Sequence, residues 1–140
     1  MTMTVSKEEI AVTNNLEEIR IEHLSKADAL DLEERAAGEL VRREEEPVPA
    51  GSLGEPITFT IALVLTAASL KAYVAHLKYK QAMLPDETLT HTVTTVGPDG
   101  STKTTEVHYA ARSGEPFGDT AVRELTSIPG LEHVIGGLAA

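Results

Sequence analysis

The chain has 140 residues, with 12 basic and 22 acidic side chains and a net charge of −10, and its length suits one domain with its own core. The negative charge repels phosphate, and with two Phe, three Tyr and no Trp there are few aromatic platforms for bases, so the composition argues against a nucleic-acid partner. The absence of cysteine excludes disulfides, thiolate nucleophiles and Cys-ligated zinc.

Residues 1–46 form an acidic N-terminal segment that begins with two short apolar runs. Residues 9–12 and 19–24 alternate as strands do, and the turn-prone pair Asn14-Asn15 lies between them, which predicts a leading β-hairpin. A single helix through residues 16–19 is the alternative. The first residues lack the basic and apolar regions of a secretory signal, so we expect a cytoplasmic protein, with membrane association as the alternative.

A helix is predicted over residues 26–43. Ser25 and Asp28 resemble a capping box, in which the serine hydroxyl accepts the third helical N–H. The apolar positions form only a thin stripe, which indicates an acidic outer helix on the surface of the domain. The acidic residues 44–46 are unfavourable at a helix C-terminus, and residues 47–55 are typical of a Pro/Gly linker.

Residues 56–84 are the most informative segment, and we predict one long apolar helix there. Pro56 suits a first helical position, and Pro85 disfavours the helical conformation at Leu84. The stretch 57–70 contains no charged residue on any side. This half of the helix therefore needs more covering surface than a simple monomer easily supplies.

Three arrangements would cover such a helix. It can be the central helix of its own domain, it can self-associate, or it can cross a membrane over residues 57–77, although its uncharged run is shorter than the roughly 20 residues that a bilayer requires. We expect a homo-oligomer, with a basic protein as the other candidate partner of the acidic front. The predicted interface combines one stripe of the helix with an exposed aromatic from a later loop: Ile57, Ile61, Val64, Leu65, Ala68 and Phe117.

Residues 88–109 predict a β-hairpin. Threonine-rich alternating strands meet at the G-P-D-G sequence of residues 97–100, which is typical of a type I turn whose last glycine adopts a positive φ. One register places every large apolar residue except Val96 on a single face, and we prefer that register. Its pairs are Leu89 with Tyr109, His91 with Val107, Val93 with Thr105 and Gly97 with Ser101.

A short helix over residues 120–127 completes a unit that spans residues 56–128. Asp119 is its predicted N-cap, and Pro129-Gly130 ends it. Residues 129–140 then read as an apolar tail. This predicted helix is short, so most of the predicted core comes from the helix 56–84 and the hairpin 88–109.

The chain offers little catalytic equipment. Its five histidines are the obvious metal or acid–base candidates, yet no two share a ligand spacing on a helix, so we predict no metal site and no cofactor. No nucleotide-binding loop, nucleophile elbow or zinc-protease motif occurs. A small enzyme that uses His76 and Tyr79, one helical turn apart, is the remaining catalytic alternative.

Together these elements predict an α+β domain, in which a small antiparallel sheet packs on the helix 56–84 and an acidic helix lies outside. We interpret the chain as a non-catalytic interaction or assembly module that self-associates through residues 57–75, with a single-pass membrane subunit as an alternative. The order of apolar helix, basic helix end and hairpin around Asp99-Gly100 resembles small effector-associated modules of bacterial conflict systems over residues 55–110. That resemblance implies an accessory role in such a system.

Overall fold

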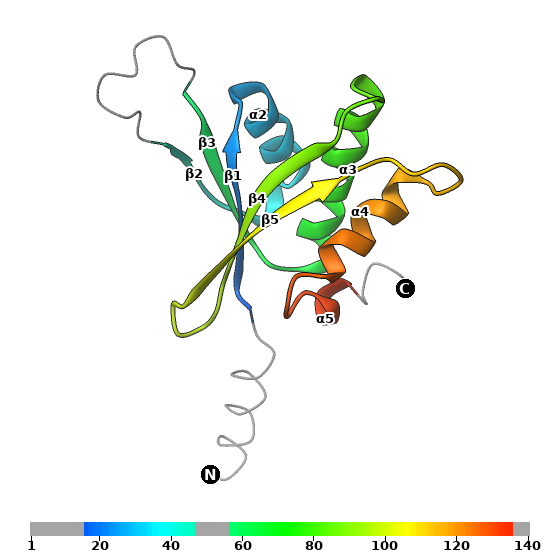
Figure 1. Ribbon diagram of the computed structural model, residues 1–140. Helices are drawn as coiled ribbons and strands as arrows, with labels where there is room; N and C mark the ends of the chain where they lie inside the picture. The colour runs from blue at the N-terminus through cyan, green and yellow to red at the C-terminus, as the bar shows by residue number, and fades with distance from the viewer. Residues whose placement is uncertain (1–15, 47–56, 136–140) are drawn as a thin grey trace.

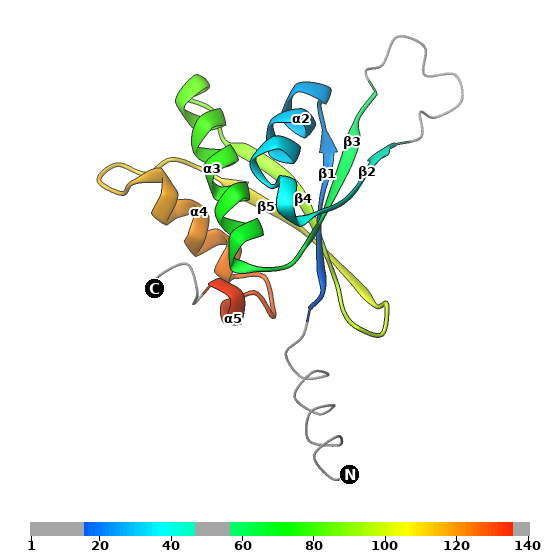
Figure 2. The same ribbon diagram turned by 180° about the vertical axis from the view of Figure 1, so that it is seen from behind.

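The protein, described by a computed structural model over residues 16–46 and 57–135, is a five-stranded antiparallel sheet with helices on one face (Figures 1 and 2). The predicted α+β class is therefore confirmed. The strands stand in the order β2-β3-β1-β4-β5. The strands are β1 (Glu18–Leu24), β2 (Leu40–Glu45), β3 (Phe59–Val64), β4 (Leu89–Val96) and β5 (Thr102–Tyr109). The helices are α2 (Lys26–Arg35), the 3-10 turn η1 (Ala37–Glu39), α3 (Ala67–Met83), α4 (Phe117–Thr126) and α5 (Glu132–Ile135).

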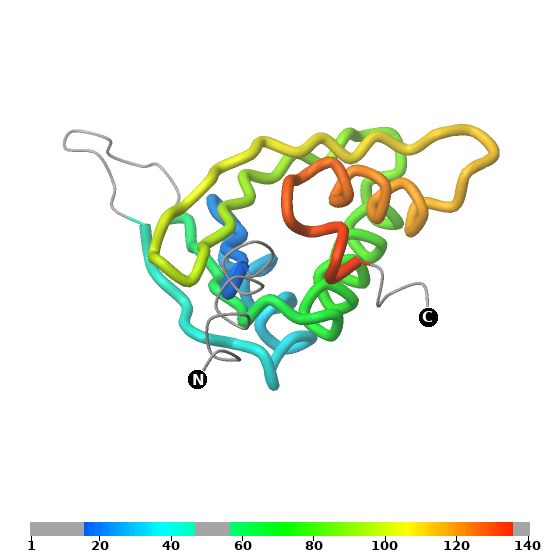
Figure 3. Tube along the Cα trace, turned by 90° about the horizontal axis from the view of Figure 1, so that it is seen from below, coloured from blue at the N-terminus to red at the C-terminus, as the bar shows by residue number. Residues whose placement is uncertain are grey.

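The topology is that of a split βαβ unit, also called ferredoxin-like, with one added strand. Helix α2 connects β1 to β2 past the intervening β3, and α3 connects β3 to β4 past β1. β5 then extends the sheet beyond β4. α4 and α5 pack beside α3, as the view from below shows (Figure 3). The two edge strands, β2 and β5, consequently lie at opposite sides of the molecule.

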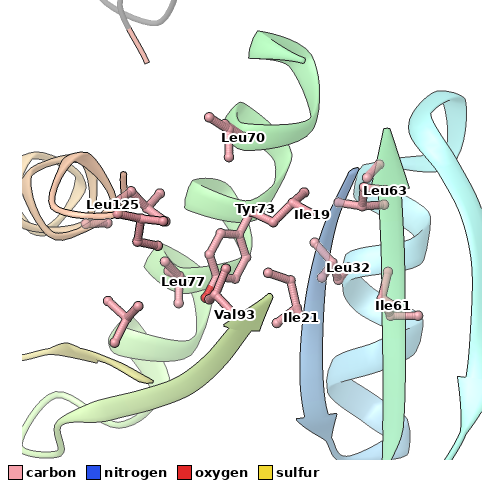
Figure 4. Packing of buried hydrophobic residues seen from close by; sticks show 14 of the residues in the cluster. Ile19, Ile21, Leu32, Ile61, Leu63, Leu70, Tyr73, Leu77, Val93 and Leu125 are labelled. Carbon is pink, nitrogen blue, oxygen red and sulfur yellow. The ribbon is translucent and has the colours of Figure 1, made fainter. Parts of the chain in front are cut away.

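The core lies between the sheet and the helices. Tyr73 of α3 projects toward β1 and β4, where it lies near Ile21 and Val93 (Figure 4). Leu32 of α2 lies behind β3, and Leu125 brings α4 against α3. The opposite face of the sheet carries mostly polar side chains, which is the usual pattern for an antiparallel sheet with only one face covered.

The predicted helix 56–84 is wrong in its first half. Residues 59–64 are the strand β3, which lies between β2 and β1, and only residues 67–83 are helical. Ile61, Ala62 and Leu63 are completely buried although they alternate between the two faces of the sheet. The core face of β3 carries Ile61 and Leu63, and its other face carries Ala62 and the exposed Val64, so the apolar run shows little polar alternation. Such a run cannot be distinguished from a buried helix by periodicity.

The start of α3 is set by a capping box at Thr66. The Thr66 hydroxyl accepts the Ser69 N–H at 3.0 Å, and the Ser69 hydroxyl accepts the Thr66 N–H at 3.0 Å. This reciprocal pair satisfies two backbone donors that a helix start otherwise leaves unpaired. The signal was present in the sequence, but serine in place of the usual glutamate made it less visible.

The predicted helix 26–43 is also too long. Ser25 caps it as expected, accepting the Asp28 N–H at 3.1 Å, but α2 ends at Arg35. A 3-10 turn follows, and residues 40–45 form β2, so Glu44 and Glu45 belong to the sheet and do not follow a helix C-terminus. The strand exists because β3 offers it a partner far along the chain, and a local propensity argument cannot detect that partner. Residues 47–55, the predicted linker, lie outside the described residues.

The predicted strand at residues 19–24 is confirmed as β1, and its position in the sheet corrects the predicted hairpin. Both edges of β1 are occupied, one by β3 and the other by β4. A hairpin between β1 and residues 9–12 therefore has no free edge on which to form. Residues 9–12 themselves lie outside the described residues.

The hairpin of β4 and β5 is confirmed in its register. Leu89 pairs with Tyr109, His91 with Val107 and Val93 with Thr105, and Gly97 N–H donates to the Ser101 carbonyl at 2.8 Å. Gly100 has φ +86°, a conformation that suits glycine because it has no Cβ. The register could be predicted because the turn residues and the alternation of apolar residues are both signals between neighbours along the chain.

The C-terminal elements differ from the prediction in their bounds. α4 begins at Phe117, with Pro116 as N-cap, so Asp119 lies in its first turn and does not cap it. The predicted apolar tail contributes to the core, because Leu131 is completely buried and Ile135, in α5, is nearly so. Residues 136–140 lie outside the described residues.

Candidate functional site

A shallow groove of about 700 Å³ runs along α2 toward β2. Its lining combines three apolar side chains with three acidic ones and no basic one. Leu30 keeps 43% of its surface exposed there. The lining residues are Leu30, Asp31, Glu33, Glu34, Ala37 and Leu40.

A smaller hollow of about 170 Å³ continues the groove on the other side of Leu30. It is bounded by β2 and β3 as well as by α2, and it mixes charges of both signs over an apolar base. Leu30 lines both hollows and therefore marks the centre of this surface. The lining residues are Lys26, Ala29, Leu30, Arg43, Glu45 and Phe59.

The groove is held in shape by contacts on both of its sides. Ala29 and Leu32 anchor α2 in the core, which leaves the opposite side of the helix free. Arg43 of β2 reaches across to Glu33 of α2, with 3.0 Å between Nη1 and Oε1. This ion pair joins β2 to α2, while none of the ion pairs among the described residues involves Glu34.

Asp31 faces the groove and also holds a buried histidine. Its Oδ2 lies 2.6 Å from His76 Nδ1 and accepts a bond from Arg35 Nε at 2.9 Å. Burial alone raises the pKa of the Asp31 carboxyl, but the hydrogen bonds from Arg35 and His76 outweigh it and leave the pKa below its ordinary value. Asp31 is therefore ionised at neutral pH, and His76 Nδ1 carries the proton that it shares with the carboxylate.

His76 belongs to a polar cluster between α2, α3 and the sheet. Its ring stacks on that of His91, with centroids 6.2 Å apart and planes 20° apart. The His91 Nδ1 lies 2.6 Å from the Tyr73 hydroxyl, which lies 3.2 Å from the Tyr109 hydroxyl. His76 is completely buried, and its Nε2 has no hydrogen-bond partner among the described residues.

The burial of this cluster determines its protonation. Burial, together with a smaller contribution from the neighbouring His76, lowers the pKa of His91 to about 4, so His91 is neutral at pH 7. Burial also raises the pKa values of Tyr73 and Tyr109, which both keep their protons. The cluster can share protons between Asp31 and His76 and between Tyr73 and His91. Because His76 is completely buried, it could contact a substrate only if α2 and α3 separated.

A second carboxylate is held at the end of β2. Glu46 accepts bonds from the backbone N–H of His23 at 2.6 Å and from the hydroxyls of Thr58 and Thr60 at 2.6 and 2.8 Å. Its other contact is His23 Nδ1 at 2.7 Å. Burial raises the pKa of Glu46, but these hydrogen bonds lower it to about 2. His23 has φ +62° at the bulge of β1, so Glu46 stabilises a backbone conformation that non-glycine residues seldom adopt.

The predicted interface residues do not form one surface. Ile61 and Leu65 are in the core of the single chain, so they are not available to a partner. Ile57 and Val64 are exposed, at 45% and 44%, on or next to β3, whereas Ala68 is exposed on α3. Phe117 is half-buried at the start of α4. A role of the exposed residues in an interface stays a prediction.

The catalytic alternative paired His76 with Tyr79. His76 is bonded to Asp31, whereas Tyr79 is 45% exposed and lies under the Arg35 guanidinium, 5.3 Å from its ring centroid. No hydrogen bond between described residues joins the two side chains. Sequence reasoning missed Asp31, Tyr73 and His91 as partners of His76, because the signal is spread over three elements that only the fold brings together.

Two further alternatives concern metal ions and membranes. Among residues 16–46 and 57–135, no three His, Asp or Glu side chains converge in a way that would hold a metal ion. In the same residues, no helix has the length and apolarity to cross a bilayer. The predicted span 57–77 is wrong as a helical span, because its first part is the strand β3.

Comparison with known proteins gives no further assignment: the chain matches no protein-family model, no curated protein and no solved structure. The resemblance to effector-associated modules therefore stays a prediction. One of the features on which the resemblance was based is wrong, because the predicted apolar helix is a strand followed by a shorter helix.

Proposed function

We propose that this protein is a non-catalytic interaction module, and that the groove along α2 binds a segment of a partner protein. The observation that carries this proposal is the combination of an exposed apolar centre, Leu30, with three acidic side chains and no basic one around the larger hollow. An apolar centre with a charged rim is the usual composition of a protein-binding surface.

The partner segment carries an aliphatic side chain flanked by lysine or arginine. The aliphatic group covers Leu30 and Leu40, and the basic groups lie against Glu34 and the outer side of Asp31. Charge complementarity supports this choice, since the whole chain has a net charge of −10 and an acidic segment would be repelled. Glu34 is the most useful of the acids, because Asp31 and Glu33 already pair with Arg35 and Arg43.

The expected affinity is moderate. Covering the exposed part of one leucine contributes about 1 kcal/mol, and each exposed ion pair contributes about 0.2–1 kcal/mol. Several such contacts must act together to offset the entropy that the segment loses on binding. The binding is therefore sensitive both to the removal of the apolar centre and to salt.

Synthetic peptides of equal length test this function. A fluorescent peptide of alternating leucine and lysine should bind the full chain, whereas peptides with glutamate in place of lysine, or serine in place of leucine, should not. Leu30→Asp and Glu34→Lys should each weaken binding at least five-fold in a fluorescence-anisotropy titration. Glu87→Lys makes the same charge change as Glu34→Lys, at an exposed loop residue outside the groove, and should weaken binding less than two-fold.

The control decides between a specific site and general attraction. If Glu87→Lys weakens binding as much as Glu34→Lys does, the peptide is held by the net charge of the chain and the proposal fails. It also fails if the leucine–lysine peptide does not bind at all. Backbone NMR shifts on titration should be confined to α2, η1 and β2.

A further inference from the structure

The two edges of the sheet differ in how they are protected against pairing with another strand. β2 has a register shift between Leu40 and Arg42, and residues 42–45 are all charged. Bulges and charges are devices by which proteins block pairing at a sheet edge. β5 pairs with β4 at every residue without a shift, contains no proline, and carries two separated charged residues, Lys103 and Glu106, where β2 has four in a row. β5 is thus the edge that is suited to accept a further strand.

The hairpin determines which backbone groups of β5 are free to pair. Gly97 N–H donates to the Ser101 carbonyl, so this pair is hydrogen-bonded, and the alternation of an antiparallel ladder makes the odd-numbered residues of β5 bond to β4. None of the other backbone hydrogen bonds among the described residues involves the even-numbered ones. The residues whose N–H and C=O groups point away from β4 are Thr102, Thr104, Glu106 and His108.

We propose that two copies of this chain pair through their β5 strands, antiparallel, about a twofold axis at Thr105. The axis stands normal to the sheet, so each face of one copy continues into the same face of the other and the two five-stranded sheets become one. Even-numbered residues then pair with even-numbered ones, which is what their outward backbone groups require.

Charge and overlap select this register among the symmetric ones. An axis at Thr105 pairs all residues from 102 to 108 and sets Glu106 opposite Thr104 of the second copy, which is a neutral residue. An axis at Glu106 would place two carboxylates opposite each other, which destabilises a strand pair. An axis at Thr104 would shorten the overlap to residues 102–106. In the selected register Lys103 lies opposite Val107, so no like charges face each other.

A second copy is the occupant because the strand is complementary to itself. Its threonine and valine residues favour a pleated, half-buried surface, and its two charged residues, Lys103 and Glu106, meet neutral ones in the pair. Each copy carries a net charge of −10, so the pairing should strengthen as salt screens the repulsion. β2 and the groove stay at the outer ends of the joined sheet, so the pairing and the groove can be tested separately.

Light scattering on the purified full chain, combined with a charge exchange at Thr105, tests the pairing. The wild type should show twice the 15.0 kDa of one chain at micromolar concentration. Thr105→Glu and Thr105→Lys each place like charges across the axis and should raise the dissociation constant at least ten-fold. An equimolar mixture of the two should restore the dimer as a heterodimer, whereas Thr105→Gln should behave as the wild type does.

Thermal unfolding of each variant checks that it is folded, and Thr104→Pro gives a second test if a charged variant is not. Proline there removes an outward N–H and keeps the backbone bonds to β4, although it loses the side-chain bond between Thr104 and Thr94, so it should also produce a monomer. A monomeric wild type overturns the proposal, as does a dimer that persists in Thr105→Glu and Thr105→Lys alone. A mixture that stays monomeric overturns it too, because the heterodimer requires this register.

Discussion

Asp31 of α2 and His76 of α3 are joined by a hydrogen bond of 2.6 Å between Oδ2 and Nδ1, and this bond connects the groove to the buried cluster. One oxygen atom thus serves two purposes, because it also accepts a bond from Arg35 at the surface. The pair fixes the tautomer of His76 and ties the two helices together. Removing this hydrogen bond should therefore lower the free energy of unfolding more than it weakens binding in the groove.

Asp31→Asn should destabilise the fold by about 1–3 kcal/mol, because a buried histidine N–H loses its charged acceptor. Glu34→Gln changes the charge of a neighbouring acid that has no such bond, and it should change stability by less than about 0.5 kcal/mol. Urea unfolding at pH 7 measures both. Equal effects of the two variants would show that the charge of α2 matters and that the contact with His76 does not.

The stability of the fold should decrease as the pH falls from about 6.5 to about 4. The pKa of His91 is lowered to about 4 in the folded state, so between these values the unfolded chain binds a proton that the folded chain does not. The stabilisation is complete above pH 6.5, and up to about 3 kcal/mol is lost by pH 4. The titratable groups that act on His91 are His76, Asp28 and Lys80.

His91→Gln should remove this part of the pH dependence. Glutamine keeps an oxygen that can accept the Tyr73 hydroxyl but does not titrate. His133→Gln, at an exposed position of α5 away from the cluster and from β5, should keep the part of the pH dependence that comes from His91. Urea unfolding of the three proteins at pH 4, 5, 6 and 7 gives the comparison. Parallel profiles for His91→Gln and the wild type would contradict the assignment.

Glu46→Gln should destabilise the fold by about 1–3 kcal/mol at neutral pH, since an amide nitrogen would face donors that now bond to a carboxylate. The pKa of Glu46 is lowered to about 2, so its stabilisation is present above about pH 4.5 and is lost as the pH falls toward 2. Glu45→Gln is the matched control on the same strand. The difference between the two variants should disappear at pH 2, and a constant difference would argue for packing instead of charge.

Thr66→Ala distinguishes the observed fold from the uninterrupted helix that the sequence suggested. In a helix over residues 56–84, alanine at this position would be neutral or stabilising because it has the higher helix propensity. In the structure the Thr66 hydroxyl caps α3 and donates to Glu39 at 2.8 Å, so its loss should cost about 1–2 kcal/mol. Thermal unfolding shows the sign of the change, and a raised melting temperature would contradict the cap.

Local signals in the sequence were sufficient for the hairpin and for the Ser25 cap. The register of β4 and β5 follows from the turn at residues 97–100 and from the alternation of apolar residues, and both involve neighbours along the chain. The same holds for β1 as a strand and for the second half of the predicted long helix. The candidate site was not predicted, because the groove requires α2 and β2 to be neighbours and β2 was read as part of a helix.

The sequence by itself determined the class of the fold, the acidic surface and the absence of cysteine chemistry, since these depend on composition and on short-range patterns. Only the tertiary structure decided that residues 59–64 are a strand, because an apolar run with little polar alternation is compatible with a buried helix and with a strand. It likewise decided that Asp31 meets His76 and that Tyr73 meets His91. Those contacts join residues 45 and 18 positions apart, and only long-range packing brings them within hydrogen-bonding distance.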